Sequence, residues 1–386
     1  MKIPALFLAL LTCVGVTAPA ATAAPEPHPA AQRACDVPPA LKLALDQLTG
    51  RHRLAGAAVE VTDPACGRWT YAGGRADLRT GRPMSAEDRL RIGSVTKTFT
   101  AATVLRLADA GRLSLDASVE RYLPGLVQGN GYDGRRITVR QLLQHTSGLP
   151  DHSDSLATAD IEWLRHHRFA PRELVERALK LPPPKGPWHY STTNYILAGL
   201  VIESVTGRPA EREISRRIIK PLELRDTYWP RRSEHIRGRH SRSYFTAERN
   251  GTAVRVDGTE WNTSAGGTGG ALISTPRDVN EFYAALLDGR LLSRHRLAEM
   301  LDTVPGDPER LGPDGRYGLG LITSPLSCGG HWTGHSGSTR AGHNTIAAVA
   351  PGGRQVTVVI NESPATDAST TAFIAVVDTA LCARTG

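Results

Sequence analysis

The chain has 386 residues, of which 40% are apolar and 22% charged, with 38 Gly and 26 Pro. These proportions are typical of a globular protein and exclude a disordered chain, a collagen-like repeat and a coiled coil. The formal net charge is +8, and only six of the 46 basic residues are lysines. Because arginine effectively never loses its proton, a reaction that needs a neutral amine must use one of those six lysines.

The first residues have the pattern of an export signal. Lys2 precedes an apolar run over residues 3–16, and Ala21-Thr22-Ala23 follows as a small-x-small cleavage site. We therefore predict that residues 1–23 are a signal peptide and that the protein is secreted and extracellular, with cell-wall association left open. A lipid anchor on Cys13 is a disfavoured alternative, because Thr12 is a poor residue there and the apolar run continues past it.

Four cysteines remain after cleavage, namely Cys35, Cys66, Cys328 and Cys382. An even number in an oxidising compartment predicts disulfides, and four cysteines allow three pairings. We favour Cys35–Cys66 and Cys328–Cys382, because each pair joins segments that should be neighbours in the expected fold.

The predicted elements change in type along the chain. A helix over residues 41–48 is followed by strands over 55–61 and 68–72. The central part has helical signals over residues 94–110, 138–144, 171–181, 194–205 and 275–287. Strand signals return over residues 318–323, 331–335, 345–350 and 355–360, and a last helix covers 366–383.

This order predicts an α/β (α+β sandwich) fold, in which strands from both chain ends build one antiparallel sheet. Helices flank the sheet, and a mostly helical lobe is inserted. We expect one domain over residues 24–386, with the sheet lobe at about 40–93 and 305–386 and the helical lobe at about 94–304. The cleft where the lobes meet is the default site.

A basic stretch over residues 231–249 contains six arginines. The first interpretation is a solvated loop, and attraction to anionic wall polymers is the alternative. Export argues against a nucleic-acid surface.

Metal chemistry has little support in the sequence. His331, His335 and His343 cluster, but no carboxylate or cysteine stands at ligand spacing and no H-E-x-x-H occurs. The G-x-S-x-G signature of the α/β-hydrolases is also absent. We therefore expect no metal and no cofactor.

Ser94-Val95-Thr96-Lys97 is an S-x-x-K motif at the start of a predicted helix. Side chains three residues apart on a helix lie one turn apart on the same face. The helix N-terminus favours the negative charge that develops on Ser94, and a buried Lys97 amine can accept its proton. The structural alternative is a capping serine beside a surface lysine.

Two further motifs follow. Tyr190-Ser191-Thr192 opens a helix, and a Tyr hydroxyl beside a cationic lysine can shuttle a proton, although an aromatic packing anchor would look the same. Gly334-His335-Ser336-Gly337-Ser338 lies on a predicted strand. There glycine permits a close approach and the two serine hydroxyls can bind a carboxylate or carbonyl, with an edge-strand kink as the alternative.

In this order the three motifs resemble the serine penicillin-recognising enzymes, and among them the class C β-lactamase-like D-alanyl-D-alanine carboxypeptidases. Further matching segments are RIGSVTKTF at 91–99, LLQHTSGL at 142–149, TNYILAG at 193–199 and YGLGL at 317–321. The resemblance runs from about residue 41 to 382. It implies a β-lactamase/transpeptidase-like fold, and the LLQHTSGL segment resembles a structural turn, so His145 is not assigned to catalysis.

The resemblance also implies the site. Ser94 is the expected acylated nucleophile, and Lys97 and Tyr190 share general-base and general-acid duty. The backbone N–H groups of Ser94 and Ser338 would form the oxyanion hole. The expected substrate-binding residues are Thr192, His335, Ser336, Gly337, Ser338 and Arg340.

Two positions depart from the family pattern. Thr192 stands where the family has Asn, and a hydroxyl offers one donor where an amide offers two, which favours ester over amide hydrolysis. The favoured relatives also carry an Arg after the Gly-Leu-Gly-Leu strand to hold the substrate's terminal carboxylate. Here Ile322-Thr323 stand there, and we hypothesise that Arg340 substitutes.

We therefore predict a β-lactamase-like serine hydrolase that forms an acyl-enzyme, first of all a D-alanyl-D-alanine carboxypeptidase acting on peptidoglycan peptides or another small acyl substrate. β-Lactam antibiotics should acylate it as covalent ligands. A same-fold esterase or class C-like β-lactamase is the first alternative, and a non-catalytic wall-binding or penicillin-sensor protein is the second. We expect a monomer with no nucleic-acid partner and no transmembrane segment.

Overall fold

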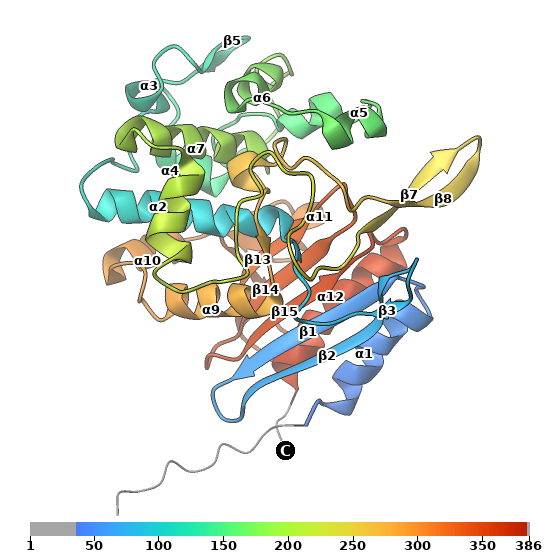
Figure 1. Ribbon diagram of the computed structural model, residues 1–386. Coiled ribbons are helices and arrows are strands. Elements are labelled where there is room, and N and C mark those ends of the chain that lie inside the picture. Colours follow the sequence, from blue (N-terminus) through green and yellow to red (C-terminus); the bar gives the residue numbers. More distant parts are fainter. Residues whose placement is uncertain (1–35, 384–386) are drawn as a thin grey trace, which may run out of the picture. The chain divides into compact units, whose positions relative to one another are not determined.

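The centre of the fold is a nine-stranded antiparallel sheet in the order β10-β11-β12-β13-β14-β15-β1-β2-β3 (Figure 1). The structure is a computed structural model that describes residues 36–383, so the predicted signal peptide lies outside the described residues. The strands are β1 Gly56–Asp63, β2 Gly67–Asp77, β3 Arg82–Pro83, β10 Val304–Pro305, β11 Arg316–Tyr317, β12 Ile322–Pro325, β13 His331–Ser338, β14 Asn344–Val349 and β15 Gln355–Ile360.

The two ends of the chain meet inside this sheet. Strand β1 pairs with β15, with Ala57 opposite Ile360 and Val61 opposite Val356. Near-continuous apolar runs suit these strands, because both faces of the sheet are covered and both sets of alternating side chains are buried. The sheet of strands from both chain ends confirms the predicted fold class.

Two terminal helices cover one face of the sheet, α1 (Pro39–Gly50) and α12 (Asp367–Cys382). In Figure 1 they lie together against the strands at the blue and red ends of the colour scale. Leu41, Leu45 and Leu48 recur at helical spacing and are fully buried against alternate residues of β1 and β15. Thr366 caps α12 by accepting the Ser369 N–H at 3.2 Å.

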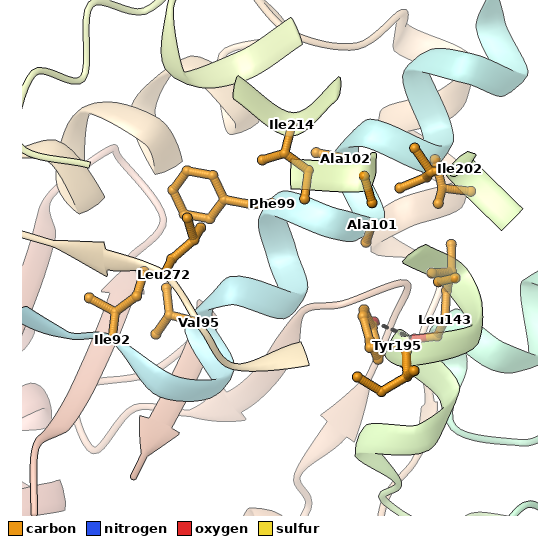
Figure 2. Packing of buried hydrophobic residues seen from close by; sticks show 14 of the residues in the cluster. Ile92, Val95, Phe99, Ala101, Ala102, Leu143, Tyr195, Ile202, Ile214 and Leu272 are labelled. Atoms are coloured by element: carbon orange, nitrogen blue, oxygen red, sulfur yellow. Dashed lines mark hydrogen bonds between the residues drawn. The ribbon is translucent and has the colours of Figure 1, made fainter. Parts of the chain in front are cut away.

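The opposite face carries the helical part of the chain. Its central helices are α2 (Thr96–Asp109), α7 (Thr192–Thr206) and α9 (Pro276–Leu287). Figure 2 shows Phe99 of α2 among Ile92, Val95 and Leu272, and the Tyr195 hydroxyl donating to the Leu143 carbonyl at 2.8 Å. Helices α2 and α7 are both largely buried, and α7 is apolar over most of its length, whereas α2 also buries Lys97 and several threonines near its start.

Shorter elements complete the described fold. The helices are α3 Val119–Tyr122, α4 Val139–Gln144, α5 Ile161–His166, α6 Pro171–Ala178, α8 Ala210–Ile214, α10 Arg294–Leu301 and α11 Pro308–Leu311. The short strand pairs are β4 Leu90–Arg91 with β9 Ile273–Ser274, β5 Gln128–Gly129 with β6 Tyr132–Asp133, and β7 Tyr244–Arg249 with β8 Thr252–Asp257. Single turns are η1 Gly93–Val95, η2 His152–Leu156, η4 Gly267–Gly269 and the π-helical η3 Ser215–Ile219.

Two predictions about elements need correction. The strand predicted over residues 318–323 starts only at Ile322, because Gly318 N–H donates to the Leu321 carbonyl at 2.8 Å and closes a turn. Gly320 has a φ of +82° there, and a Cβ on it would stand 2.7 Å from Ala101 Cβ. The basic stretch 231–249 is not a loop throughout, since its last residues form β7 of a hairpin.

The disulfide predicted between Cys328 and Cys382 is confirmed. Cys66 is also a disulfide cysteine, but Cys35, its predicted partner, lies outside the described residues. Disulfides of this kind persist in oxidising compartments. Within residues 36–383, no helix has both the length and the hydropathy needed to cross a membrane.

Candidate active site

Ser94 and Lys97 come together where the η1 turn runs into α2. The Lys97 ammonium donates to Ser94 Oγ at 3.1 Å, to the Gly269 carbonyl at 2.9 Å and to Thr192 Oγ1 at 3.5 Å. Lys97 is fully buried, while Ser94 is only half-buried and reaches solvent. The three N–H donors of the ammonium therefore face two hydroxyls and a carbonyl, and none of these three partners is a carboxylate.

Tyr190 completes this group from the segment just before α7. The Lys97 ammonium lies 4.8 Å from the centre of the Tyr190 ring, and the His145 ring packs against the same ring at 4.4 Å. The structure thus brings Ser94, Lys97, Tyr190 and Thr192 together at the starts of α2 and α7, although Lys97 and Thr192 are 95 residues apart in sequence.

His145 holds the segment that carries Tyr190. Its Nδ1 accepts the Ser191 N–H at 3.2 Å, and the Asn194 amide lies at the same distance. Burial first, and the Lys97 charge second, hold the pKa of His145 well below its usual value, so the ring is neutral. A neutral imidazole whose Nδ1 accepts the Ser191 N–H supports Tyr190 by packing, which is in keeping with leaving His145 out of catalysis.

The third motif brings strand β13 against the nucleophile. A Cβ on Gly337 would stand 2.1 Å from the Ile92 carbonyl oxygen and 2.9 Å from Ser94 N, so only glycine fits. Gly93 has a φ of +51°, and a Cβ on it would stand 2.6 Å from the Ser338 carbonyl oxygen. These two glycines bring the Ser94 and Ser338 backbones together, which is the arrangement that the predicted oxyanion hole requires.

His335 lies beneath this surface and does not face the cavity beside Ser94. It is buried and shares a 2.9 Å hydrogen bond with the Tyr317 hydroxyl, while Ser336 points to solvent. Burial first, and Lys97 second, lower the pKa of His335 to about 3. His335 is therefore neutral at neutral pH. A lysine at this first position of the third motif would carry a positive charge, and His335 does not.

A cavity of about 180 Å³ opens beside Ser94. Four of the predicted site residues line it, namely Ser94, Thr192, Ser338 and Arg340. The Arg340 guanidinium donates to the carbonyls of Leu156 at 2.9 Å and Ser153 at 3.2 Å, so it also ties the turn after β13 to η2. The far wall is apolar and is formed by Leu156, Leu164 and Trp261.

Asp151 is a site residue that the sequence reasoning missed. Its carboxylate accepts the Thr192 N–H at 2.8 Å and the Ser153 N–H at 2.9 Å, and so orients Thr192 toward Lys97. Burial alone would raise the pKa of Asp151, but His152 and the two N–H donors outweigh burial and lower it. Nothing in the sequence around Asp151 marks this role, because Thr192 lies 41 residues further on.

The Gly269 carbonyl and Arg310 were also missed. A glycine-rich run, Gly266-Gly267-Thr268-Gly269-Gly270, was the available signal for the first. A Cβ on Gly269 would stand 2.7 Å from Thr192 Cγ2, so glycine is needed where this loop approaches Lys97. Arg310 of α11 stacks on Tyr190, with its guanidinium carbon 4.1 Å from the ring centre.

The histidine cluster considered for zinc is dispersed. His331 is exposed, whereas His343 is buried and bonded to Ser241 Oγ at 3.1 Å. Across residues 36–383 no group of three or more His, Cys, Asp or Glu side chains is gathered to hold a metal ion.

A half-exposed serine one turn from a buried lysine, at the edge of an antiparallel sheet, defines a serine hydrolase with the fold of the penicillin-recognising enzymes. The family profile described as "Beta-lactamase" matches residues 41–380. The chain therefore belongs to the beta-lactamase family.

Several solved structures share this fold and part of the sequence. A D-stereospecific amidohydrolase from Streptomyces sp. is 39% identical, with a TM-score of 0.80, and the match covers 89% of this chain and 98% of that one. The D-amino acid amidase from Ochrobactrum anthropi SV3 is 27% identical with a TM-score of 0.75, over 88% and 98% of the two chains.

Curated relatives match over shorter stretches. Esterase EstB of Burkholderia gladioli is 35% identical over 48% of this chain and 50% of its own length. Penicillin-binding protein 4* of Bacillus subtilis is 27% identical over 68% of this chain and 60% of its own length. The chain thus spans about half to three fifths of the length of these two relatives.

Proposed function

We propose that this protein hydrolyses amide or ester bonds at the carbonyl of a D-amino-acid residue through an acyl-enzyme on Ser94. The D-alanyl-D-alanine carboxypeptidase predicted from the sequence is one case of this activity. The observation that carries the proposal is the contact of Ser94 Oγ with the buried Lys97 ammonium beside an open cavity. The 39% identity to a D-stereospecific amidohydrolase over 89% of the chain supports the choice of a D-configured substrate.

The proposed reaction is a series of proton transfers between Ser94, Lys97, Tyr190 and the substrate. This step requires Lys97 in its neutral amine form, which takes the proton of Ser94 Oγ as the oxygen attacks the substrate carbonyl carbon. The oxyanion accepts hydrogen bonds from the N–H groups of Ser94 and Ser338. Tyr190 passes a proton to the leaving nitrogen or oxygen as its bond to the carbonyl carbon breaks, which leaves an ester on Ser94. A water then attacks this ester, loses its proton to the same groups and releases the acid.

The cavity beside Ser94 suits a bulky acyl side chain. Its volume of about 180 Å³ exceeds the roughly 150 Å³ of an engineered apolar cavity that binds benzene. The wall of Leu156, Leu164 and Trp261 is buried and apolar, so a phenyl ring that enters moves its apolar surface out of water, which is favourable. The Ochrobactrum anthropi amidase has been solved with D-phenylalanine, which supports an aromatic acyl residue here.

The leaving group should lie outside the cavity that holds the acyl side chain, because neither Tyr190 nor Arg310 lines this cavity. Because Tyr190 protonates the leaving atom, a group stacked on Tyr190 contacts the leaving group rather than the acyl residue. Arg310 is stacked there, it is exposed, and its guanidinium has no carboxylate partner in the described part of the chain. A free guanidinium edge suits the carboxylate of a departing D-amino acid, and this supports carboxypeptidase action.

The test compares three substrates at equal concentration. They are an N-acylated D-Ala-D-Ala peptide, D-phenylalanine amide with its L-enantiomer, and a short-chain ester, with product release followed by mass spectrometry. We expect release from the D-configured amide and peptide, none from the L-amide, and no activity in Ser94→Ala. Hydrolysis of the ester alone, or equal rates on both enantiomers, would overturn the proposal.

An esterase is the second candidate, and Thr192 is the observation that favours it. The Thr192 hydroxyl stands 3.5 Å from the Lys97 ammonium, where the family amide would reach the substrate carbonyl with a second donor. The alcohol of an ester leaves the carbonyl carbon more readily than the amine of an amide does. Ester hydrolysis therefore depends less on a second hydrogen-bond donor to the substrate carbonyl. The ester arm of the same experiment separates the two candidates.

Penicillin should acylate Ser94, because its strained amide presents the same carbonyl to the same nucleophile. A fluorescent penicillin is expected to label the protein covalently and to leave Ser94→Ala unlabelled. Equal labelling of both proteins would show that the reaction does not use Ser94.

A further inference from the structure

Two adjoining hollows on the helical part of the chain have no role in the proposed reaction. Their volumes are about 900 and 720 Å³, and four residues border both of them, namely Glu211, Arg212, Trp229 and Arg231. We call the pair the basic groove. Its cationic side chains are Arg168, Arg208, Arg212, Arg216, Lys220, Arg231, Arg232 and Arg237.

The basic groove concentrates the positive charge of the molecule. Eight cationic side chains face three carboxylates there, those of Glu203, Glu211 and Glu213, which gives a net charge of +5. The whole chain has a formal net charge of +8. More than half of the excess charge therefore lines one continuous hollow, which raises the local concentration of anions.

The cations that border the groove are largely free to bind a ligand. Glu213 is buried and pairs with Arg216 at 2.9 Å, Arg217 at 2.8 Å and Arg208 at 3.8 Å. By contrast, Arg212, Arg231 and Arg232 are exposed and have no carboxylate partner within residues 36–383. Uncompensated guanidinium groups with free forked donors bind phosphate oxygens in pairs.

We propose that the basic groove binds an anionic polymer with a phosphodiester-linked polyol backbone, such as poly(glycerol phosphate). A hollow lined by several cations over two adjoining cavities suits a chain that carries one charge per repeat. A nucleic acid would need exposed aromatic faces on which successive bases stack. Here Arg237 covers the Tyr228 ring at 4.1 Å and Trp229 is half-buried, so the groove offers no such row of platforms.

The groove adjoins the active site through one loop. Thr263 borders both the groove and the cavity beside Ser94, and the same loop presents the Gly269 carbonyl to Lys97. A protein held on such a polymer would keep its nucleophile close to the polymer surface. The groove would then localise the hydrolase without taking part in the reaction.

The test measures binding of the full chain to immobilised poly(glycerol phosphate) as a function of salt. We expect Arg231→Glu/Arg232→Glu to weaken binding at least about tenfold and to flatten the salt dependence, because two phosphate contacts are lost. The matched control is Arg51→Glu/Arg136→Glu, which makes the same charge change at exposed sites that do not border the groove. This control should weaken binding less than twofold.

Each other outcome overturns the proposal. Equal weakening by the control pair would mean attraction to net charge alone. Tighter binding to single-stranded DNA of equal charge, or to vesicles of anionic lipid, would assign the groove to another partner. Hydrolysis of a small soluble substrate serves as a separate readout and should be unchanged in both pairs, so a failure of the proposed function would not affect the binding result.

Discussion

Lys97 carries the same charge as the forty arginines of the chain but differs in what it can do with a proton. Its stem is buried within α2, and its ammonium reaches Ser94 Oγ at 3.1 Å. A guanidinium in the same place would keep the charge and the hydrogen bonds, but it could not accept the serine proton.

Lys97→Arg should therefore abolish acylation while the fold is retained. We expect the rate of covalent labelling by a fluorescent penicillin to fall by about 10²–10⁴, the usual contribution of a general base. Lys42→Arg is the matched control, because Lys42 is exposed on α1 and lies 5.7 Å from the Tyr71 ring, away from the site. Normal labelling of Lys97→Arg would mean that another group accepts the proton.

Thr192 is a second single residue with a testable effect, because its side chain should set the relative rates of amide and ester hydrolysis. Thr192→Asn restores the second donor, so we expect the ratio of kcat/KM for an amide to that for an ester to rise about fivefold, the equivalent of one hydrogen bond. Thr192→Val, which keeps the shape and removes the hydroxyl, should lower both rates. The idea fails if the asparagine variant leaves the ratio unchanged.

The catalytic residues could be predicted from the sequence where they lie close together along the chain. Ser94 and Lys97 are three residues apart, so helical periodicity alone puts them on one face. Asp151, Gly269 and Arg310 reach the same site through tertiary contacts over long sequence separations, and no local pattern records those contacts.

Strand β13 and the η1 turn are in close backbone contact, and each supplies one glycine that makes this contact possible, Gly337 from β13 and Gly93 from η1. Gly337→Ala should force β13 away from Ser94, because its Cβ would stand 2.1 Å from the Ile92 carbonyl oxygen. We expect a loss of about 1–3 kcal/mol in the free energy of unfolding and at least a tenfold drop in acylation rate.

Gly50→Ala is the control for this prediction, because a Cβ there meets no atom within 4 Å. Urea unfolding and penicillin labelling of both variants provide the measurement. If Gly337→Ala acylates at the normal rate, the close approach of β13 is not needed for the oxyanion hole.

Strand β1 buries a carboxyl group against α9. Burial raises the pKa of Glu60 from 4.5 to about 7, although the nearby Arg68 opposes this. The native state therefore binds a proton more tightly than the unfolded state, and this contribution to stability is present below pH 4.5 and is lost as the pH rises through 7.

Glu60→Gln should make the protein more stable than the wild type above pH 7, by up to about 3 kcal/mol, and should flatten the decline between pH 4.5 and 7. Thermal unfolding at pH 5 and pH 8 measures this. Glu248→Gln on the exposed end of the β7–β8 hairpin is the control and should change neither value. A parallel decline in Glu60→Gln and wild type would assign the pH dependence to other groups.

The elements themselves were predicted best where a helix cap or an apolar run that follows a turn signal marks them. Strand β15 has the predicted bounds, and α9 follows the Thr275-Pro276 start signal. The segment 318–321 was wrongly assigned because its apolar residues look like a strand, while Gly320 bends the backbone to clear Ala101. That clearance is set by α2, which is distant in sequence.

At the scale of the whole molecule, the sheet forms only when the C-terminal segment of the chain packs against the N-terminal segment. Strand β1 pairs with β15, and α12 packs with α1 on one face. The Cys328–Cys382 disulfide joins the connection between β12 and β13 to the last residue of α12, and Ser327 N–H donates to Asp378 at 2.8 Å beside it. This junction closes a loop with a sequence separation of 54 residues.

Replacing both cysteines, as Cys328→Ser/Cys382→Ser, should lower the free energy of unfolding by about 4 kcal/mol, the chain-entropy value for a loop of this length. Neither cysteine borders the cavity beside Ser94, so the penicillin-labelling rate at 25 °C should stay within twofold of the wild type. Denaturant unfolding and labelling of the same samples separate the two effects. An unchanged unfolding midpoint would show that the α12 junction is held by packing alone, and a lost labelling rate would show that it also positions β13.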